Sequence, residues 1–405
     1  MRIFLLSALI VSQLNLWAVS FEDFDSYQNK LTKAEIQKRL DTFLEKGPEI
    51  RKYYSLTEKE LRLGEIASEK FDYILQLKVE PEKKTVTKRD LKGARIAIDP
   101  GHFGGRWAKL EQRFIYMQTQ NPPKTYSFDE GTLTYLTALY LKALLEAEGA
   151  IVFLTRSSLD QGSLNENFFQ WLETHPEHWH GKESLSQLFR GYYNRLDMAH
   201  RAELINEFNP DITLILHYNA SSGVENKPSN AYTTPSNYNL VFIPGSFKKS
   251  DLDLVEDRYH FLRLLVSDHL DESLLLSKHI AKAFTQELKV PLIPDANNGY
   301  EPNVCIKQTE GIYSRNLFLT RSIKSPLCYG ETLIQNNPEE MDRLSSLETE
   351  VAGIACSKRV LEVAQAYYKG IKNYFKRSPL KEPQKKPQDS LTRSKNPKAK
   401  TKTIR

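Results

Sequence analysis

Cysteine is scarce in this sequence of 405 residues, which contains only Cys305, Cys328 and Cys356. An odd number of cysteines without regular spacing excludes a disulfide framework and allows at most one bridge. No two of them form a close C-x-x-C pair, which argues against zinc ligation by cysteine. We therefore expect these three residues to act as small buried hydrophobic side chains.

Long apolar runs are also missing, apart from one at the start of the chain. Met1-Arg2 is positively charged, residues 3–16 are mainly apolar, and Ala18 and Ser20 are the small residues that a signal peptidase reads. A membrane anchor is the alternative, but the run is short and interrupted by polar residues. We predict a signal peptide over 1–20 and an exported protein, periplasmic or else secreted. No cysteine follows the cleavage point, which argues against a lipoprotein.

Acidic residues are nearly absent from the last thirty positions. Residues 376–405 contain eleven Lys and Arg but only Glu382 and Asp389, so the remaining chain is about −4 although the net charge is +5. Large apolar side chains are also rare there, which predicts a disordered basic tail. The tail either contacts an anionic surface or is merely solvated. No specific nucleic-acid partner and no further membrane span are predicted.

The segment 21–79 has helical periodicity. Thr32-x-x-Glu35 is a candidate capping box, and a second candidate, Thr57-x-x-Glu60, precedes more apolar residues at helical spacing. We therefore predict a small helical module over 21–79, followed by a charged linker over 80–92.

Strands and helices alternate over 93–375. The runs 96–99, 151–154, 212–216, 240–243 and 327–329 are mainly apolar, and helical patterns separate most of them. This alternation predicts an α/β domain with a mainly parallel twisted sheet and helices on both faces.

Two of these strands end in histidine. Residues 96–102 read IAIDPGH, so His102 follows a buried strand, and His217 ends the strand 212–216. In open α/β sheets, ligands gather at the carboxyl ends of the strands, so two imidazoles there indicate a shared metal. Glu130, which opens the next helix, and Glu111 in the preceding loop are both candidates for a third ligand. Glu130 also fits an ordinary capping box with Ser127.

Glu331 follows the strand 327–329 and is a candidate for proton transfer at such a metal. A carboxylate beside an apolar wall and a metal can be tuned toward a neutral pKa. The alternative is an ordinary surface glutamate at the end of a strand.

Four blocks of sequence resemble one known family. Residues 96–105 read IAIDPGHFGG, 130–132 read EGT before LTR at 154–156, 211–219 read DITLILHYN, and 331–337 read ETLIQNN. In this order, the blocks resemble the zinc-dependent N-acetylmuramoyl-L-alanine amidases of the cell-division type, the amidase-3 family. The resemblance covers roughly residues 93–370.

The resemblance implies a function and a set of site residues. It implies Zn²⁺ held by His102, Glu130 and His217, with Glu331 as the catalytic base. Asn219 and Arg321 are further candidates for contact with the substrate or with the ligands. The implied activity is hydrolysis of the amide between N-acetylmuramic acid and L-alanine in peptidoglycan, in cell-wall remodelling and cell separation, and a protein activator is a possible partner.

Two other functions stay open. One is a zinc peptidase acting on stem peptides, for which Arg315 or Arg321 would bind a free carboxylate. The other is a non-catalytic wall-binding protein that retains the four blocks only as structure.

The chain also departs from the family pattern. A long loop follows Gly105, and an insertion before Arg195 contains Trp171, Trp179 and the run HPEHWH at 175–180. We expect this insertion to be an exposed aromatic loop rather than a second metal site. The segment 247–271 is either an inhibitory plug over the metal or a surface helix.

Overall fold

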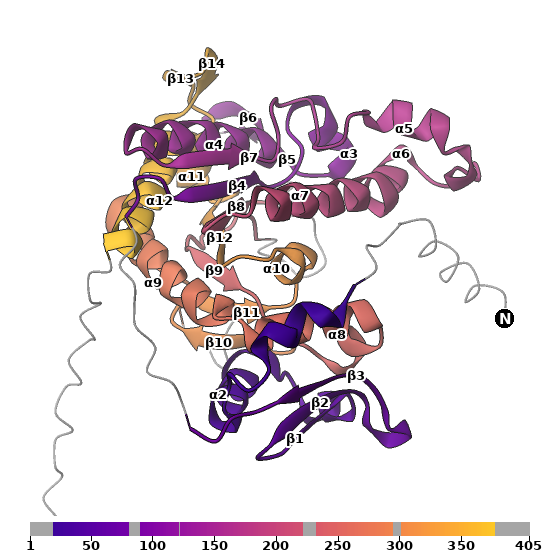
Figure 1. Cartoon of the computed structure of the whole chain (residues 1–405). Helices are drawn as coiled ribbons and strands as arrows, with labels where there is room; N and C mark the ends of the chain where they lie inside the picture. The colour runs from indigo at the N-terminus through magenta and orange to yellow at the C-terminus, as the bar shows by residue number, and fades with distance from the viewer. Residues whose placement is uncertain (1–18, 81–89, 121, 222–231, 295–300, 377–405) are drawn as a thin grey trace, which may run out of the picture.

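The computed structural model describes residues 19–80, 90–120, 122–221, 232–294 and 301–376. A seven-stranded sheet of order β10-β11-β9-β12-β8-β4-β7 runs through its centre (Figure 1). The strands are β4 (Arg95–Pro100), β7 (Ile151–Leu154), β8 (Ile212–Asn219), β9 (Leu240–Ile243), β10 (Cys305–Thr309), β11 (Ile312–Arg315) and β12 (Leu327–Ile334). Four neighbouring pairs are parallel, and the pairs β10–β11 and β12–β9 are antiparallel. The mainly parallel sheet is confirmed.

Helices cover both faces of this sheet, as the continuous apolar strands require. Along β4, Ile96 and Ile98 enter the core beneath α4 (Glu130–Ala147), α9 (His269–Leu288) and α12 (Lys358–Lys376). Ala97 points to the opposite core, which it shares with α7 (Asn194–Phe208) and α10 (Phe318–Ser322). Successive side chains of a strand point to opposite faces, so one short segment serves both cores. Before α12 lie α11 (Pro338–Leu344) and the hairpin β13 (Thr349–Val351) and β14 (Ile354–Cys356).

The N-terminal module is helical only in its first half. It contains a 3₁₀ helix at Phe21–Tyr27, α2 (Lys33–Arg39), a π-helical turn at Leu40–Leu44 and a 3₁₀ helix at Pro48–Lys52. The predicted capping box of Thr32 and Glu35 is present.

The helix expected after Thr57 is wrong, because 54–76 forms an antiparallel sheet. Its strands are β1 (Tyr54–Leu56), β2 (Glu60–Glu65) and β3 (Lys70–Gln76). Leu61 and Leu63 are buried on either side of the exposed Arg62, and Leu75 is buried opposite Leu61. This alternation has the period of a strand, and it prevails over the helical spacing of the larger apolar residues.

The segment 247–271 joins this module to the sheet. It contains a short 3₁₀ helix (Lys249–Leu252) and α8 (Val255–Val266), which is buried along most of its length. The Arg258 guanidinium pairs with Asp72 at 2.5 Å, and the Tyr259 hydroxyl donates to Asp23 at 2.6 Å. Asp257 pairs with Arg321. Asp253 likewise accepts from the Tyr53 hydroxyl, and Asp271 pairs with Arg39, so these carboxylates are held by residues outside the predicted metal site.

The loop after Gly105 and the later insertion are both folded. The loop contains α3 (Ala108–Glu111) and the hairpin β5 (Phe114–Gln120) and β6 (Pro123–Asp129). The insertion contains α5 (Phe168–Thr174) and α6 (Leu185–Leu188), which share an aromatic core with Phe103 and Trp107. Trp171 is buried in that core, whereas Trp179 is exposed. The prediction of an exposed aromatic loop therefore holds for Trp179 but not for Trp171.

Three predictions fall mainly on residues outside the described ranges. The signal peptide falls mainly on residues 1–18 and the basic tail on 377–405, and both ranges lie outside the described residues, as does most of the linker. Among the residues that the structure describes, no helix combines the length and apolarity needed to cross a membrane.

Candidate metal and catalytic site

The three candidate ligands come together at one edge of the sheet. His102 follows β4, His217 lies near the end of β8, and Glu130 is the first residue of α4. Their ligand atoms lie within 4.8 Å of one another. His217 Nδ1 is 3.0 Å and His102 Nε2 is 3.5 Å from the same Glu130 oxygen, Oε1. In the described part of the chain this is the one such group of three or more His, Cys, Asp or Glu residues.

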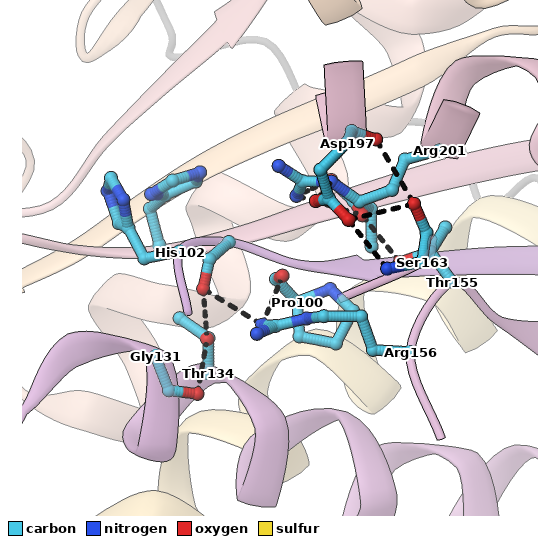
Figure 2. Close-up of polar contacts among 12 residues, drawn as sticks. Pro100, His102, Gly131, Thr134, Thr155, Arg156, Ser163, Asp197 and Arg201 are labelled. Carbon is cyan, nitrogen blue, oxygen red and sulfur yellow. Dashed lines mark hydrogen bonds and ion pairs between the residues drawn. The ribbon is translucent and has the colours of Figure 1, made fainter. Parts of the chain in front are cut away.

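A buried polar network holds the loop that carries His102 (Figure 2). The Arg156 guanidinium donates to the carbonyls of Pro100 and Gly101 at 2.5 and 3.1 Å, and the Thr134 hydroxyl donates to Gly101 at 2.6 Å. His102 itself adopts a left-handed conformation with φ of 57°. Such a conformation is costly for a residue other than glycine and persists only when its surroundings enforce it.

Asp99 anchors the same loop from inside the protein. Its carboxylate accepts from the Thr155 hydroxyl at 2.6 Å and pairs with Arg201 at 3.2 Å. Arg201 lies 2.9 Å from Asp197, whose carboxylate accepts from Ser163 (Figure 2). These charges are buried and mutually paired, so the strand end is held in one position.

Gly101 allows the two histidines to approach each other. A Cβ atom at this position would lie 2.3 Å from the His217 ring. Any larger residue would therefore displace that ring. The two imidazole rings are 4.6 Å apart and nearly perpendicular.

Glu130 is placed by the start of α4. Asp129 caps the helix by accepting from the Thr132 amide, so the capping box proposed with Ser127 is wrong and the Glu130 carboxylate is free to face the histidines. It also accepts from the Tyr218 amide at 3.1 Å. Burial alone would raise the pKa of Glu130, but His102 and His217 outweigh it and lower that pKa to about 2. Glu130 is therefore an ionised carboxylate facing two imidazole nitrogens.

Glu111 supports His102 and does not join the cluster. Its carboxylate contacts His102 Nδ1 at 2.8 Å and accepts from the Phe103 amide at 2.7 Å. Although burial opposes ionisation, His102 and the Phe103 amide lower the pKa of Glu111. Of the two carboxylates left open by the sequence, the structure thus places Glu130 in the cluster and Glu111 behind it. With Nδ1 occupied, Nε2 is the nitrogen of His102 that faces the site.

Glu331 stands beside His217 because β12 and β8 are parallel in that register. It lies inside β12 and not at its end as expected. Burial and the nearby charge of Glu130 raise the pKa of Glu331 to about 8. Two residues earlier on the same strand, Tyr329 stacks on the His217 ring at 4.5 Å. The site therefore combines Glu130, a carboxyl group held ionised, with Glu331, whose pKa lies near neutral; the first suits a metal ligand and the second a proton-transfer group.

Of the two residues predicted to contact the substrate or the ligands, only Asn219 lies on a strand that carries a member of the cluster. Asn219 ends β8, two residues after His217 and therefore on the same face of the strand, and its side-chain oxygen accepts from the Ala220 amide. Arg321 lies on α10 and pairs with Asp257 at 3.0 Å, so the structure does not bring it to the cluster. Arg315 pairs with Glu301 at 2.9 Å.

Sequence reasoning assigned no role to Tyr329 or Gln335, and it considered Glu111 only as a ligand and not as a support for His102. The Gln335 amide donates to Glu130 at 3.3 Å and to the Tyr218 carbonyl at 3.0 Å. Gln335 lies four residues after Glu331, in the last of the four sequence blocks. Its place in that block is the only feature of the sequence that could have pointed to a role in the site.

Several solved structures resemble this fold at low identity. They include the CwlD amidase from Clostridioides difficile in complex with the GerS lipoprotein (18% identity, 71% of this chain and 100% of that chain, TM-score 0.41). They also include the N-acetylmuramyl-L-alanine amidase Ami1 from Mycobacterium smegmatis (13%, 71% and 100%, TM-score 0.42). No curated protein matches the chain.

A family model gives the decisive match. The model described as N-acetylmuramoyl-L-alanine amidase (amidase 3) matches residues 96–373, which is more than half of the chain. The match begins in β4, just before His102, and ends in α12, so it includes every residue of the cluster and Glu331. The chain therefore belongs to the N-acetylmuramoyl-L-alanine amidase family.

Proposed function

We propose that this protein is a zinc-dependent amidase that cleaves the bond between the lactyl group of N-acetylmuramic acid and L-alanine in peptidoglycan. The observation that carries the proposal is the convergence of His102, Glu130 and His217, with Glu331 directly beside His217 on the neighbouring strand. Family membership supplies the scissile bond.

The donor set fits zinc. Two imidazoles and one carboxylate are a common set of protein ligands in catalytic zinc sites, where a fourth position stays open. The Glu130 carboxylate is held ionised, and Glu111 fixes which nitrogen of His102 faces the site. When bound, zinc would supply a Lewis acid that polarises the amide carbonyl and acidifies water.

Glu331 is proposed as the proton-transfer residue. In its ionised form, its carboxylate takes a proton from the attacking water and then gives a proton to the departing nitrogen of L-alanine. Its raised pKa suits this double role, because a carboxyl group with a pKa near neutrality can accept a proton from water and hold it until the amine leaves. Asn219 lies on the same face as His217 and is the proposed contact for substrate.

Glu111 is proposed to hold His102 for zinc. Replacing Glu111 with Ala should weaken zinc affinity by about 10–100-fold, since a carboxylate behind a metal-binding histidine orients the ring and raises its basicity. Competition titration with a zinc chelator measures the effect. Glu111→Gln, which keeps a hydrogen-bond acceptor, should lie between Glu111→Ala and the wild type. Unchanged affinity in both variants would mean that Glu111 only stabilises the loop.

The proposed activity has a direct test. Purified peptidoglycan is digested with zinc-loaded protein, and the released products are analysed by mass. Stem peptides with a free L-alanine amino group are expected, whereas cleavage within the stem would indicate a peptidase. The structure favours the amidase over that alternative, because Arg315 and Arg321, the arginines considered for a terminal carboxylate, are both paired with acidic residues. Binding to peptidoglycan without any product would indicate a wall-binding protein.

Export to the periplasm, a role in cell separation and a protein activator remain proposals from the sequence. The first residues, on which export rests, lie outside the described residues. Detection of the mature amino terminus at Phe21 in an extracytoplasmic fraction would test the export proposal.

A further inference from the structure

Arg113 lies next to the candidate ligand Glu130. The Glu130 amide donates to the Arg113 carbonyl at 3.2 Å, and the next residues along the hairpin, Phe114 and Asp129, are directly paired. Residues directly opposite each other in an antiparallel pair have their side chains on the same face, about 5 Å apart at Cβ. The hairpin register and this backbone hydrogen bond therefore place Arg113 next to Glu130 at the start of α4.

The guanidinium of Arg113 is available to a ligand. The residue is exposed, and within the described residues its side chain has no ion pair or hydrogen bond. Its charge contributes to lowering the pKa of both Glu130 and Glu331, although burial and the other groups of the site have larger effects. Arg113 thus combines closeness to the proposed metal and base with an unpaired positive charge.

The other arginines around the site already have partners. Arg156 donates to the carbonyls of the His102 loop, Arg201 pairs with Asp99, and Arg315 pairs with Glu301. Among these four arginines, Arg113 alone has a side chain left for an anionic group that arrives with the substrate. Arginine binds carboxylates in a planar, two-point geometry and suits this purpose.

The chemistry of the substrate indicates which anion this is. The carboxyl group of the lactyl ether is consumed in the scissile amide, and the remaining groups of the amino-sugar chain are neutral. The nearest anion is therefore on the peptide side, at the second stem residue. That residue is a D-glutamate linked through its side-chain carboxyl group, so its α-carboxylate is free unless it is amidated.

We propose that Arg113 binds the α-carboxylate of the second stem residue and makes the enzyme prefer stems in which that carboxylate is not amidated. This inference rests on the proposed amidase function and adds a specificity-determining residue to it. A charge-assisted hydrogen bond of this kind corresponds to a preference of about tenfold to a hundredfold.

The test compares two small substrates, N-acetylmuramoyl-L-alanyl-γ-D-glutamate and its α-amide. The wild type should cleave the acid with a kcat/KM at least about tenfold above that of the amide, mostly through KM. In Arg113→Gln, the KM for the acid should rise to that for the amide, so that the enzyme no longer distinguishes the two substrates. Arg106→Gln is the matched control, since Arg106 is exposed on the same loop and lies over the Trp107 ring at 4.6 Å.

Two results would overturn the proposal. One is a wild type that does not distinguish the two substrates. The other is a loss in Arg113→Gln that is equal for both, because Arg113 would then act on the metal site itself. If the enzyme cleaves peptidoglycan but neither small compound, the binding of both compounds to zinc-loaded Glu331→Gln protein is measured by calorimetry. Equal affinities for the acid and the amide would refute the contact between Arg113 and the carboxylate. Failure to cleave peptidoglycan as well would refute the proposed function, while the same binding measurement still judges Arg113.

Discussion

Replacing Glu331 with Gln is expected to lower kcat on peptidoglycan by about 10²–10⁴-fold while zinc content stays the same. The amide has nearly the shape of the carboxyl group, but it cannot accept a proton from water and return it to the leaving nitrogen. The ligands His102, Glu130 and His217 lie on other elements, so metal binding should survive. Release of stem peptides measured by mass, together with metal analysis of the same protein, checks both parts. A variant of unchanged activity would remove Glu331 from the reaction.

The same variant has a second readout in the metal-free protein. A glutamate in an unfolded chain has a pKa of about 4.3, whereas burial and Glu130 raise the pKa of Glu331 to about 8. Between these values the folded state holds a proton that the unfolded state has lost, so this group makes stability fall as pH rises. Glu331→Gln removes the effect. It should therefore be more stable than the wild type by roughly 2–4 kcal/mol at pH 8 and nearly equal at pH 4.5. Equal stability at both pH values would contradict the raised pKa.

Removal of the metal is expected to abolish amidase activity and to lower the stability of the folded protein. A ligand at about 1,000 times its dissociation constant stabilises the state that binds it by about 4 kcal/mol. Adding zinc to chelated protein should restore activity and raise the free energy of unfolding by about that amount, as measured by denaturation with and without zinc. His217→Ala should show neither response.

A second histidine variant serves as the control. His180 is exposed in the insertion and lies outside the described metal group, so His180→Gln should respond to zinc as the wild type does. If stabilisation by zinc persisted in His217→Ala and vanished in His180→Gln, the metal would lie in the insertion and the proposed site would be wrong.

The local pattern of apolar residues was sufficient to predict most strands of the central sheet. The segments that form β4 and β8 are mainly apolar, and a strand of this kind must be covered on both faces, so the α/β class and the delivery of His102 and His217 to one edge were predictable. The same reasoning failed over 54–76. There Leu61, Leu63 and Leu75 alternate with polar neighbours at the period of a strand, while a few larger residues happen to have helical spacing.

The choice between Glu111 and Glu130 was not predictable from the residues alone. Glu111 ends a short helix and Glu130 begins a long one, and nothing local separates a ligand from a supporting carboxylate. The family resemblance favoured Glu130. In the fold, α3 directs Glu111 to the far nitrogen of His102, while α4 directs Glu130 to the near nitrogen. The loop of Arg113 was likewise visible only as an insertion until its pairing with Glu130 was known.

The α/β class, the edge of the sheet that carries the site and the residues that the family blocks imply for it could all be predicted from the amino-acid sequence. Apolar periodicity and strand-ending residues are properties of neighbours in the chain, and they need no knowledge of distant contacts. Only the tertiary structure decided the pairing of Glu331 with His217, the support of His102 by Glu111, and the raised pKa of Glu331. These features depend on register between strands and on burial among charges from separate elements, which no local pattern encodes.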